Sequence, residues 1–420
     1  MEFTAFPTEL LEQIASHLDY NSAKNLHSAV SGSQLYLDGN VDYVSLKKVC
    51  DERLSVRHYV DRNFGDAKAL FTAMSKNYTY LSGSRSLEFF VPGTVTDESD
   101  WDFYIPMNLA YIGNFMQALE SMDVKWMSYE DELAWKLKHY TTPFTIERVK
   151  LFHMAGSGEM RRAVVRCGLN IEDQDELELT EYYKISIEQR NVRITPCDIS
   201  EMEYPGTSGY RVASGLLAHG PRVTLVQLMG ERRPHGDSYI HSPFSYHSSC
   251  VQSFISPYVS CHLYGSMACN GITHGWRDHI DDESEQNVCR LTPGSHIDTS
   301  GVPKWNKYAL RGFKYIDPLG SYLELKIRKP TDELSIWIEH DYDIGAGTDV
   351  KNMYQRSYAN MIWHEKPYGP HPLYSHVYDL YGYSELSVDH WVTSKYCSDS
   401  ERKGLEYLPA GVDYIMRPVH

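Results

Sequence analysis

Residues 78–106 read YTYLSGSRSLEFFVPGTVTDESDWDFYIP, and they are the part of the sequence that says most about the fold. Residues 78–81 predict a short strand that stops at a Gly-Ser turn, and residues 85–90 predict a short helix. Residues 100–105 begin with polar and apolar residues in alternation and are rich in aromatic side chains, which indicates a second strand. The order strand, turn, short helix and strand therefore predicts two neighbouring strands in one mixed sheet.

The second predicted strand places two carboxylates on one face. Successive side chains of a strand point to opposite faces, so Asp100 and Asp102 share a face, while Trp101 and Phe103 point the other way into a helix-covered core. Two adjacent carboxylates repel each other unless a cation lies between them. Mg²⁺ takes carboxylate oxygens together with substrate phosphates. The aspartate pair is therefore a candidate metal site, and the alternative is a hairpin that carries two solvated aspartates.

The Gly-Ser turn adds the donors that a phosphate needs. Gly83 lets the backbone approach a ligand closely, and the Ser84 hydroxyl and the start of the next helix supply hydrogen-bond donors. Together with the aspartate pair, this turn would hold a nucleoside triphosphate and its magnesium ion. That arrangement serves phosphoryl or nucleotidyl transfer.

This pattern resembles the signature of the polymerase-beta-like nucleotidyltransferase superfamily, a Gly-Ser turn followed by Asp-x-Asp on the next strand. Gly83 and Ser84 match the first element, and Asp100 and Asp102 match the second, although the 15 residues between Ser84 and Asp100 are slightly long for the family. More narrowly, the stretch looks like a group of uncharacterised fungal proteins, with the resemblance running over residues 66–330. It implies an α/β (α+β) fold with a nucleotidyltransferase-like mixed sheet flanked by helices, and a triphosphate held by Gly83, Ser84 and Arg85.

The same resemblance implies a third catalytic carboxylate on a strand beside the Asp-x-Asp strand. VTLVQLM (residues 223–229) is the best later strand, but its inward polar residue is Gln227, a neutral amide. Glu188 in KISIEQ and Asp198 after VRITPC are the two candidates for the third carboxylate. An active transferase and a degenerate one both stay open. The run HSSCVQSFISPYVSCHLYG (residues 247–265) is predicted to be a helix.

The N-terminal residues form a separate helical pattern. Leu10, Leu11, Ile14 and Leu18 follow the 3.6-residue period of one helix, and a second helix begins near Ser22. Two helices this short cannot bury enough apolar surface to be stable alone. They therefore need either the rest of the chain or another protein as a partner.

This segment, FPTELLEQIASHLDYNSAKNLHSAVS (residues 6–31), resembles an F-box. It has the Pro-anchored start, the Leu-rich first helix, the Asp-containing turn and a second helix that ends at Val-Ser. Phe6 stands where the family usually has Leu, and the aromatic or basic residue expected after Ser31 is missing. The resemblance implies a Skp-type adaptor bound through Leu10, Leu11, Ile14 and Leu18. The alternative function is then a substrate receptor of a Skp–cullin ubiquitin ligase that uses its large domain as a binding platform. An ordinary helical pair docked on the main domain would give the same pattern.

Composition and charge narrow the possible partners. The 40 Lys and Arg residues against 56 Asp and Glu give a formal net charge of −16, which disfavours bulk binding to nucleic acid or anionic lipid. No stretch approaches the roughly 20 apolar residues that span a bilayer. The eight cysteines form no CxxC motif and indicate reduced thiols. A cytoplasmic or nuclear location is therefore expected.

Four segments follow from these patterns. Residues 1–38 are the F-box-like module and residues 39–65 a helical connector. Residues 66–330 are the nucleotidyltransferase-like domain. Residues 331–420 form a Tyr- and His-rich C-terminal extension packed on the core.

Overall fold

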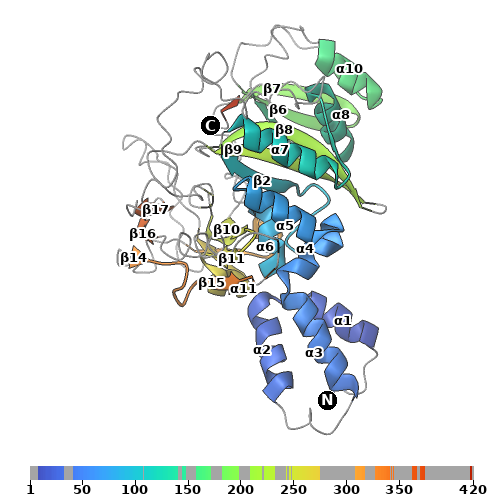
Figure 1. Cartoon of the computed structure of the whole chain (residues 1–420). Helices are drawn as coiled ribbons and strands as arrows, with labels where there is room; N and C mark the ends of the chain where they lie inside the picture. Colours follow the sequence, from blue (N-terminus) through green and yellow to red (C-terminus); the bar gives the residue numbers. More distant parts are fainter. Residues whose placement is uncertain are drawn as a thin grey trace.

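The chain has mixed α and β structure, in which helices flank a large mixed sheet (Figure 1). A computed structural model describes residues 8–32, 41–106, 108–140, 144–147, 158–171, 182–197, 209–219, 222–231, 243, 246, 248–274, 308–316, 327–340, 342, 344, 362–366, 369–373 and 417–418. Within these ranges, no helix has both the length and the apolar character needed to cross a membrane.

The described part of the main sheet has nine strands. Only the pair β2–β9 is parallel, and all the other pairs are antiparallel. In spatial order the strands are β15 (Ile336–Glu339), β11 (Val259–His262), β10 (Ser253–Ile255), β1 (Tyr80–Ser82), β2 (Trp101–Pro106), β9 (Arg222–Glu231), β8 (Gly209–His219) and β18 (Arg417–Pro418), and β3 (Val124–Trp126) also pairs with β8. The two strands predicted around the Gly-Ser turn are thus confirmed as neighbours, β1 and β2.

Helices cover the face of β2 that carries its large apolar residues. These helices are α4 (Val56–Phe64), α5 (Ala67–Lys76) and α7 (Leu109–Glu120). The ring of Trp101 lies 4.8 Å from that of Phe64 in α4, and the ring of Phe103 lies 5.4 Å from that of Phe115 in α7. Trp101 and Phe103 are fully buried. The predicted direction of these two side chains is confirmed, and Asp102 therefore points to the opposite face.

The run at residues 247–265 is not a helix, and its helical prediction is wrong. After a short 3₁₀ turn, η5 (Ser249–Val251), it forms the hairpin β10–β11, and β10 pairs with β1. Pro257 lies at the reversal, where Ser256 N–H donates to the Val259 carbonyl at 2.8 Å. Residues 248–262 carry no acidic, Lys or Arg side chain and are all buried. Such an uncharged run suits strands that are covered on both faces.

The N-terminal module contains three helices: α1 (Thr8–Ser16), α2 (Tyr20–Gly32) and α3 (Val41–Leu54). The two predicted helices are confirmed, and α3 packs against both of them. They share a small core of Leu11, Val30, Leu46 and Cys50. The module therefore extends past residue 38, and of the predicted connector only α4 joins the core of the main body. Figure 1 shows the module projecting from one end of the molecule.

The module docks on the C-terminal end of α6 (Gly83–Phe90), the short helix between β1 and β2. The ring of Tyr20 lies 6.0 Å from the rings of both Phe89 and Phe90. Arg53 Nε donates to the Leu18 carbonyl at 2.9 Å, and its guanidinium lies 5.7 Å from the Phe89 ring. One helix thus carries the Gly-Ser turn at its first residues and the module joint at its last.

A second sheet lies beyond β8 in Figure 1. Its strand order is β4 (Phe144–Glu147), β6 (Tyr182–Glu188), β7 (Asn191–Cys197) and β5 (Asn170–Ile171). Two helices, α8 (Tyr129–His139) and α10 (Gly158–Arg166), pack together beside it and share a core with β6 and β7.

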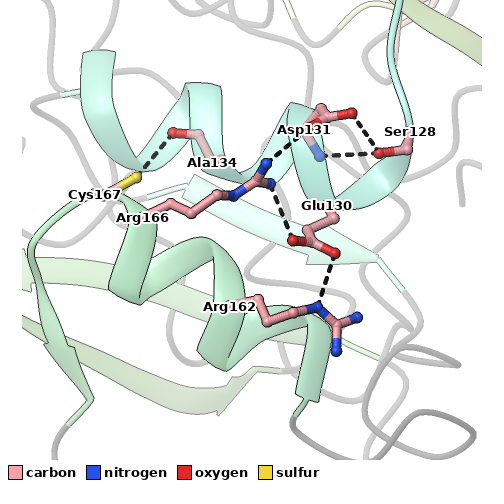
Figure 2. Close-up of polar contacts among 7 residues, drawn as sticks. All are labelled: Ser128, Glu130, Asp131, Ala134, Arg162, Arg166 and Cys167. Carbon is pink, nitrogen blue, oxygen red and sulfur yellow. Dashed lines mark hydrogen bonds and ion pairs between the residues drawn. The ribbon is translucent and has the colours of Figure 1, made fainter.

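Ion pairs join α8 to α10, as Figure 2 shows. Arg166 contacts Glu130 at 3.2 Å and Asp131 at 3.1 Å, and Arg162 contacts Glu130 at 3.2 Å. Hydrogen bonds from Ser128, with Arg166 close by, lower the pKa of Asp131. Because these groups are largely solvated, we assign them a modest structural role.

The predicted C-terminal extension supplies the strand at each end of the described main sheet. β15 pairs with β11 at one end, and β18 pairs with β8 at the other. Three further strands, β14 (Ile327–Arg328), β16 (Ile362–Lys366) and β17 (Gly369–Leu373), form a small sheet. Next to β11 in sequence lie α11 (Gly265–Cys269) and β12 (Ile272–His274), and β12 pairs with β13 (Lys314–Ile316).

Candidate functional site

The Gly-Ser turn touches one of the two predicted metal-binding aspartates. Ser82, the last residue of β1, pairs with Asp102 in β2. Gly83 has a φ of +72°, and a Cβ built on it would lie 2.6 Å from Asp102 Oδ2. The left-handed backbone favours glycine, and any side chain at this position would displace the Asp102 carboxylate. Glycine therefore keeps the turn and the carboxylate in contact.

Ser84 and Asp100 are close to this contact in the sequence. Ser84 is buried in the first turn of α6, and Asp102 is half-buried in β2. Asp100 is also half-buried and directly precedes β2. The start of α6, which has a partial positive charge, therefore faces the Asp102 carboxylate of β2.

Arg85 makes different contacts from those expected of a phosphate ligand at the turn. Its guanidinium lies 5.0 Å from the Trp101 ring centre, and its Nη2 donates to the Ser99 carbonyl at 2.8 Å. The Tyr59 hydroxyl donates to the Arg85 carbonyl at 2.6 Å. Arg85 therefore holds the chain that leads into β2.

An amide stands beside Asp102 on the adjacent strand. Asp102 pairs with Gln227 of the parallel strand β9, as the sequence predicts for the inward polar residue of this strand. Ser214 of β8 follows Gln227 across the sheet. Paired residues of neighbouring strands point to the same face, so Asp102, Gln227 and Ser214 form a row of oxygen-bearing side chains with one negative charge.

Neither candidate for the third carboxylate is placed beside this row. Glu188 is exposed at the last position of β6, in the four-stranded sheet rather than in the sheet of Asp102. Asp198 lies outside the described residues. In the part of the chain that the structure describes, no three His, Cys, Asp or Glu side chains are grouped to hold a metal ion. Glu188 therefore lies in a different sheet from Asp102, and Asp198 stays a prediction.

The sequence patterns above did not single out a buried glutamate on β9. Glu231 closes β9 on the same face as Gln227, is buried, and accepts a hydrogen bond from the Tyr80 hydroxyl. It lies four residues beyond Gln227, about 13 Å along the strand at 3.3 Å per residue. Extending the alternation Gln227, Met229, Glu231 by one step would have found it. At this distance it supports Tyr80 and does not complete the aspartate pair.

Three buried tyrosines cluster on the sheet next to Asp102. Tyr80 and Tyr104 stack with their ring centres 5.3 Å apart, and the Tyr246 hydroxyl donates to the Tyr104 hydroxyl at 2.7 Å. Burial, with the negative charge of Asp102 nearby, raises the pKa of both Tyr104 and Tyr246. These phenols therefore stay neutral and add no further charge to the site.

A glutamate of α6 fixes the loop before Asp100. The Glu88 carboxylate accepts hydrogen bonds from the backbone N–H groups of Gly93 at 3.1 Å, Thr94 at 2.8 Å and Val95 at 3.1 Å. Bonds from neutral donors to a carboxylate are stronger than those between neutral groups. The helix that begins at the turn thus also holds the loop that brings in the second strand.

The arrangement suits one hard cation bound together with an anion. Two carboxylates and an amide supply oxygen atoms, and the start of α6 supplies donors. Neither a protein-family model, nor a curated protein, nor a solved structure matches this chain.

Proposed function

We propose that this chain is a nucleotidyltransferase-like protein that binds a nucleoside triphosphate with one magnesium ion and is degenerate for nucleotidyl transfer. One observation carries the proposal: the Gly83 turn is packed against Asp102, while the position beside Asp102 on β9 is Gln227. The turn and the aspartate pair support binding. The amide argues against transfer.

The residues present fit a single magnesium ion. Mg²⁺ is commonly held by one or two carboxylates together with phosphate oxygens of the substrate, and Asp100 and Asp102 would supply the carboxylates. Gly83 and Ser84 would place backbone N–H groups and a hydroxyl at the phosphates, at the positive end of α6. Bound magnesium would neutralise phosphate charge.

Among the described residues, no third carboxylate lies beside Asp102, and this separates nucleotide binding from nucleotidyl transfer. Two-metal transfer needs enough negative charge to hold a second cation, which Gln227 does not provide. Glu188 lies in the other sheet. The site of the described residues thus has the charge for one metal ion.

Asp102→Asn should abolish magnesium-dependent nucleotide binding without unfolding the protein. Calorimetric titration with ATP and the other nucleotides, with and without Mg²⁺, should show binding by the wild type and at least a tenfold weaker affinity for the variant. The metal-free variant should melt no lower than the wild type, because the substitution removes the repulsion between two adjacent aspartates. Asp97→Asn is the matched control, since Asp97 is an exposed aspartate of the preceding loop.

Three further outcomes bear on the proposal. No magnesium-dependent binding by the wild type would overturn it. Gln227→Glu restores a charge beside Asp102, so this variant should bind Mg²⁺ more tightly than the wild type. Measurable nucleotidyl transfer by the wild type would contradict the degenerate assignment while leaving nucleotide binding intact.

A second function, adaptor binding, is favoured by the surface of α1. Leu10 and Ile14 lie four residues apart on one helix face and are 36% and 37% exposed, whereas Leu11 and Ala15 are buried. Exposed apolar side chains that gather on one face of a projecting module are typical of an interface. We propose that this face, with the half-buried Leu18, binds a Skp-type adaptor and makes the chain an F-box-like substrate receptor.

Replacing both exposed residues, Leu10→Glu with Ile14→Glu, should abolish capture of a Skp-type adaptor by the full-length protein in a pull-down. The melting temperature should change little, because both side chains are already exposed. Glu12→Lys is the control, because Glu12 is exposed on the other side of α1 and the change alters charge equally strongly. If the wild type captures no adaptor, the F-box assignment fails.

A further inference from the structure

Two buried polar side chains, Ser214 of β8 and Trp135 of α8, each carry an atom that no other group satisfies. Among the residues that the structure describes, Ser214 Oγ and Trp135 Nε1 are buried atoms without a hydrogen-bond partner. Ser214 is 4% exposed and Trp135 is 8% exposed. A buried donor without a partner is unfavourable and uncommon in folded proteins, so the two atoms are suited to a ligand that would satisfy them.

Ser214 lies in line with Asp102 across the sheet. Asp102 pairs with Gln227 of β9, and Gln227 pairs with Ser214 of β8. Neighbouring strands are about 4.8 Å apart, so Ser214 lies about 10 Å from Asp102 on the same face. Gln227, between the two, is half-buried, and the row is therefore accessible to solvent at its centre.

Trp135 packs on the same face, one step along the two strands. It forms a small core with Leu225, and Leu216 packs against this core. Leu225 lies two residues before Gln227 on β9 and therefore shares its face. Leu216 lies two residues after Ser214 on β8, and it pairs with Leu225. The indole ring of Trp135 is thus next to the row that begins at Asp102.

Aromatic neighbours hold the Trp135 ring in one orientation. The ring of His139 stacks on it with the centres 4.6 Å apart, and the ring of Tyr140 meets it edge-on at 5.9 Å. His139 Nδ1 also lies 2.8 Å from the Trp135 carbonyl. Aromatic side chains with a few fixed polar groups are typical of small-molecule sites. The direction of the indole N–H is therefore set before a ligand binds.

We propose that Gln227, Ser214 and Trp135 form the subsite for the sugar and base of the nucleotide. This inference rests on the proposed function and deepens it, because it assigns the half of the site that holds no phosphate. β1 with the Gly83 turn lies on one side of β2, whereas β9 and β8 lie on the other. A triphosphate at the turn therefore leaves the nucleoside to extend over β9 and β8.

The chemistry of the three side chains fits the uncharged half of a nucleotide. An indole N–H only donates, so Trp135 requires an acceptor, such as a ring nitrogen or a carbonyl oxygen of the base. A serine hydroxyl and a glutamine amide can each donate and accept, which suits the hydroxyl groups of a ribose. None of the three carries a charge, so the subsite adds nothing to the binding of phosphate alone.

The test compares calorimetric titrations of the full-length protein with ATP and with inorganic tripolyphosphate, both with Mg²⁺. Trp135→Phe keeps an aromatic ring but removes the N–H, and Ser214→Ala removes the hydroxyl. Each variant should bind ATP about fivefold more weakly, the loss expected for one hydrogen bond, and the double variant about tenfold or more. The affinity for tripolyphosphate should stay at the wild-type value in all three.

Trp126→Phe is the matched control for Trp135→Phe. Trp126 of β3 is an indole on the opposite face of the same sheet, where its Nε1 donates to the Met116 carbonyl of α7 at 3.4 Å. The substitution removes the same group and ring volume, so a general effect on folding should be similar. This variant should bind both probes as the wild type does.

The outcomes separate this inference from the proposed function. Wild-type ATP affinity in Trp135→Phe and Ser214→Ala would overturn the subsite, while ATP binding that requires Mg²⁺ and Asp102 would keep the nucleotide function. An equal loss of affinity for both probes would overturn it as well, since the residues would then act on the phosphates or on the fold. A wild type that binds neither probe overturns both proposals.

Discussion

Gly83→Val should destabilise the protein by about 3 kcal/mol and remove magnesium-dependent nucleotide binding. A non-glycine residue with positive φ costs on the order of 1–3 kcal/mol, and a branched side chain is at the upper end. The φ of Gly83 is +72°, and its new Cβ would lie 2.6 Å from Asp102 Oδ2. The carboxylate must therefore move away from the metal position. Denaturant unfolding measures the first effect and calorimetric titration the second.

The control for this substitution is Gly93→Val. Gly93 has a similar φ of +83°, but no atom lies within 4 Å of a Cβ built there. This variant should lose comparable stability from the backbone and keep its affinity for Mg-ATP. Wild-type affinity in Gly83→Val would show that the contact between the turn and Asp102 has no part in binding.

The free energy of unfolding should fall steeply in acid because of His262. This residue of β11 is fully buried, its Nδ1 accepts the Tyr264 N–H at 3.1 Å, and its Nε2 lies 3.0 Å from the Cys250 carbonyl. Nδ1 as acceptor and Nε2 as donor define a neutral imidazole. Protonation would break the bond from Tyr264, and burial lowers the pKa of His262 from 6.5 to about 3.

The sign of the effect follows from which state binds the proton. Between pH 6.5 and about pH 3 the unfolded chain protonates this histidine and the folded chain does not. The free energy of unfolding should therefore drop by about 1.4 kcal/mol for each pH unit below 6.5 on account of this residue, and it should be unaffected above that pH. Urea unfolding at pH 7, 6, 5 and 4 gives the slope.

His262→Gln should be less stable than the wild type at pH 7 but should lose this part of the pH dependence. His17→Gln, at an exposed histidine after α1, should keep the wild-type slope. Equal slopes for wild type and His262→Gln would contradict the assignment.

Local patterns were enough to predict the strands around Asp102 and the direction of their side chains. The alternation of residues 100–105 determined which side chains of β2 face the helices, and Trp101 and Phe103 confirm it. The strand pattern of residues 223–229 indicated from the sequence alone that Gln227 points inward. The structure adds that Gln227 lies beside Asp102. In both cases the signal comes from residues within one element.

Features that depend on distant residues could not be predicted in this way. The hairpin β10–β11 was misread because its Ser, Cys and His residues have no strong period, and its strand character depends on burial against β1 and β15. Arg311 reaches Ser99 from far along the chain, and no local motif marks it. Residues 39–65 were predicted as a helical connector, but the place of α3 in the module becomes recognisable only when its small apolar face packs on α1 and α2.

The position of β1 in the sheet determines when its second edge is covered during synthesis. β1 has β2 on one side and β10 on the other, and the Ser82 hydroxyl donates to the Ser253 carbonyl, 171 residues later. At about 5–20 residues per second, a ribosome needs about 9–34 s to add those residues. Throughout that interval β1 has an open edge that can pair with another nascent chain. The part of the sheet around the Gly83 turn is therefore completed late in translation.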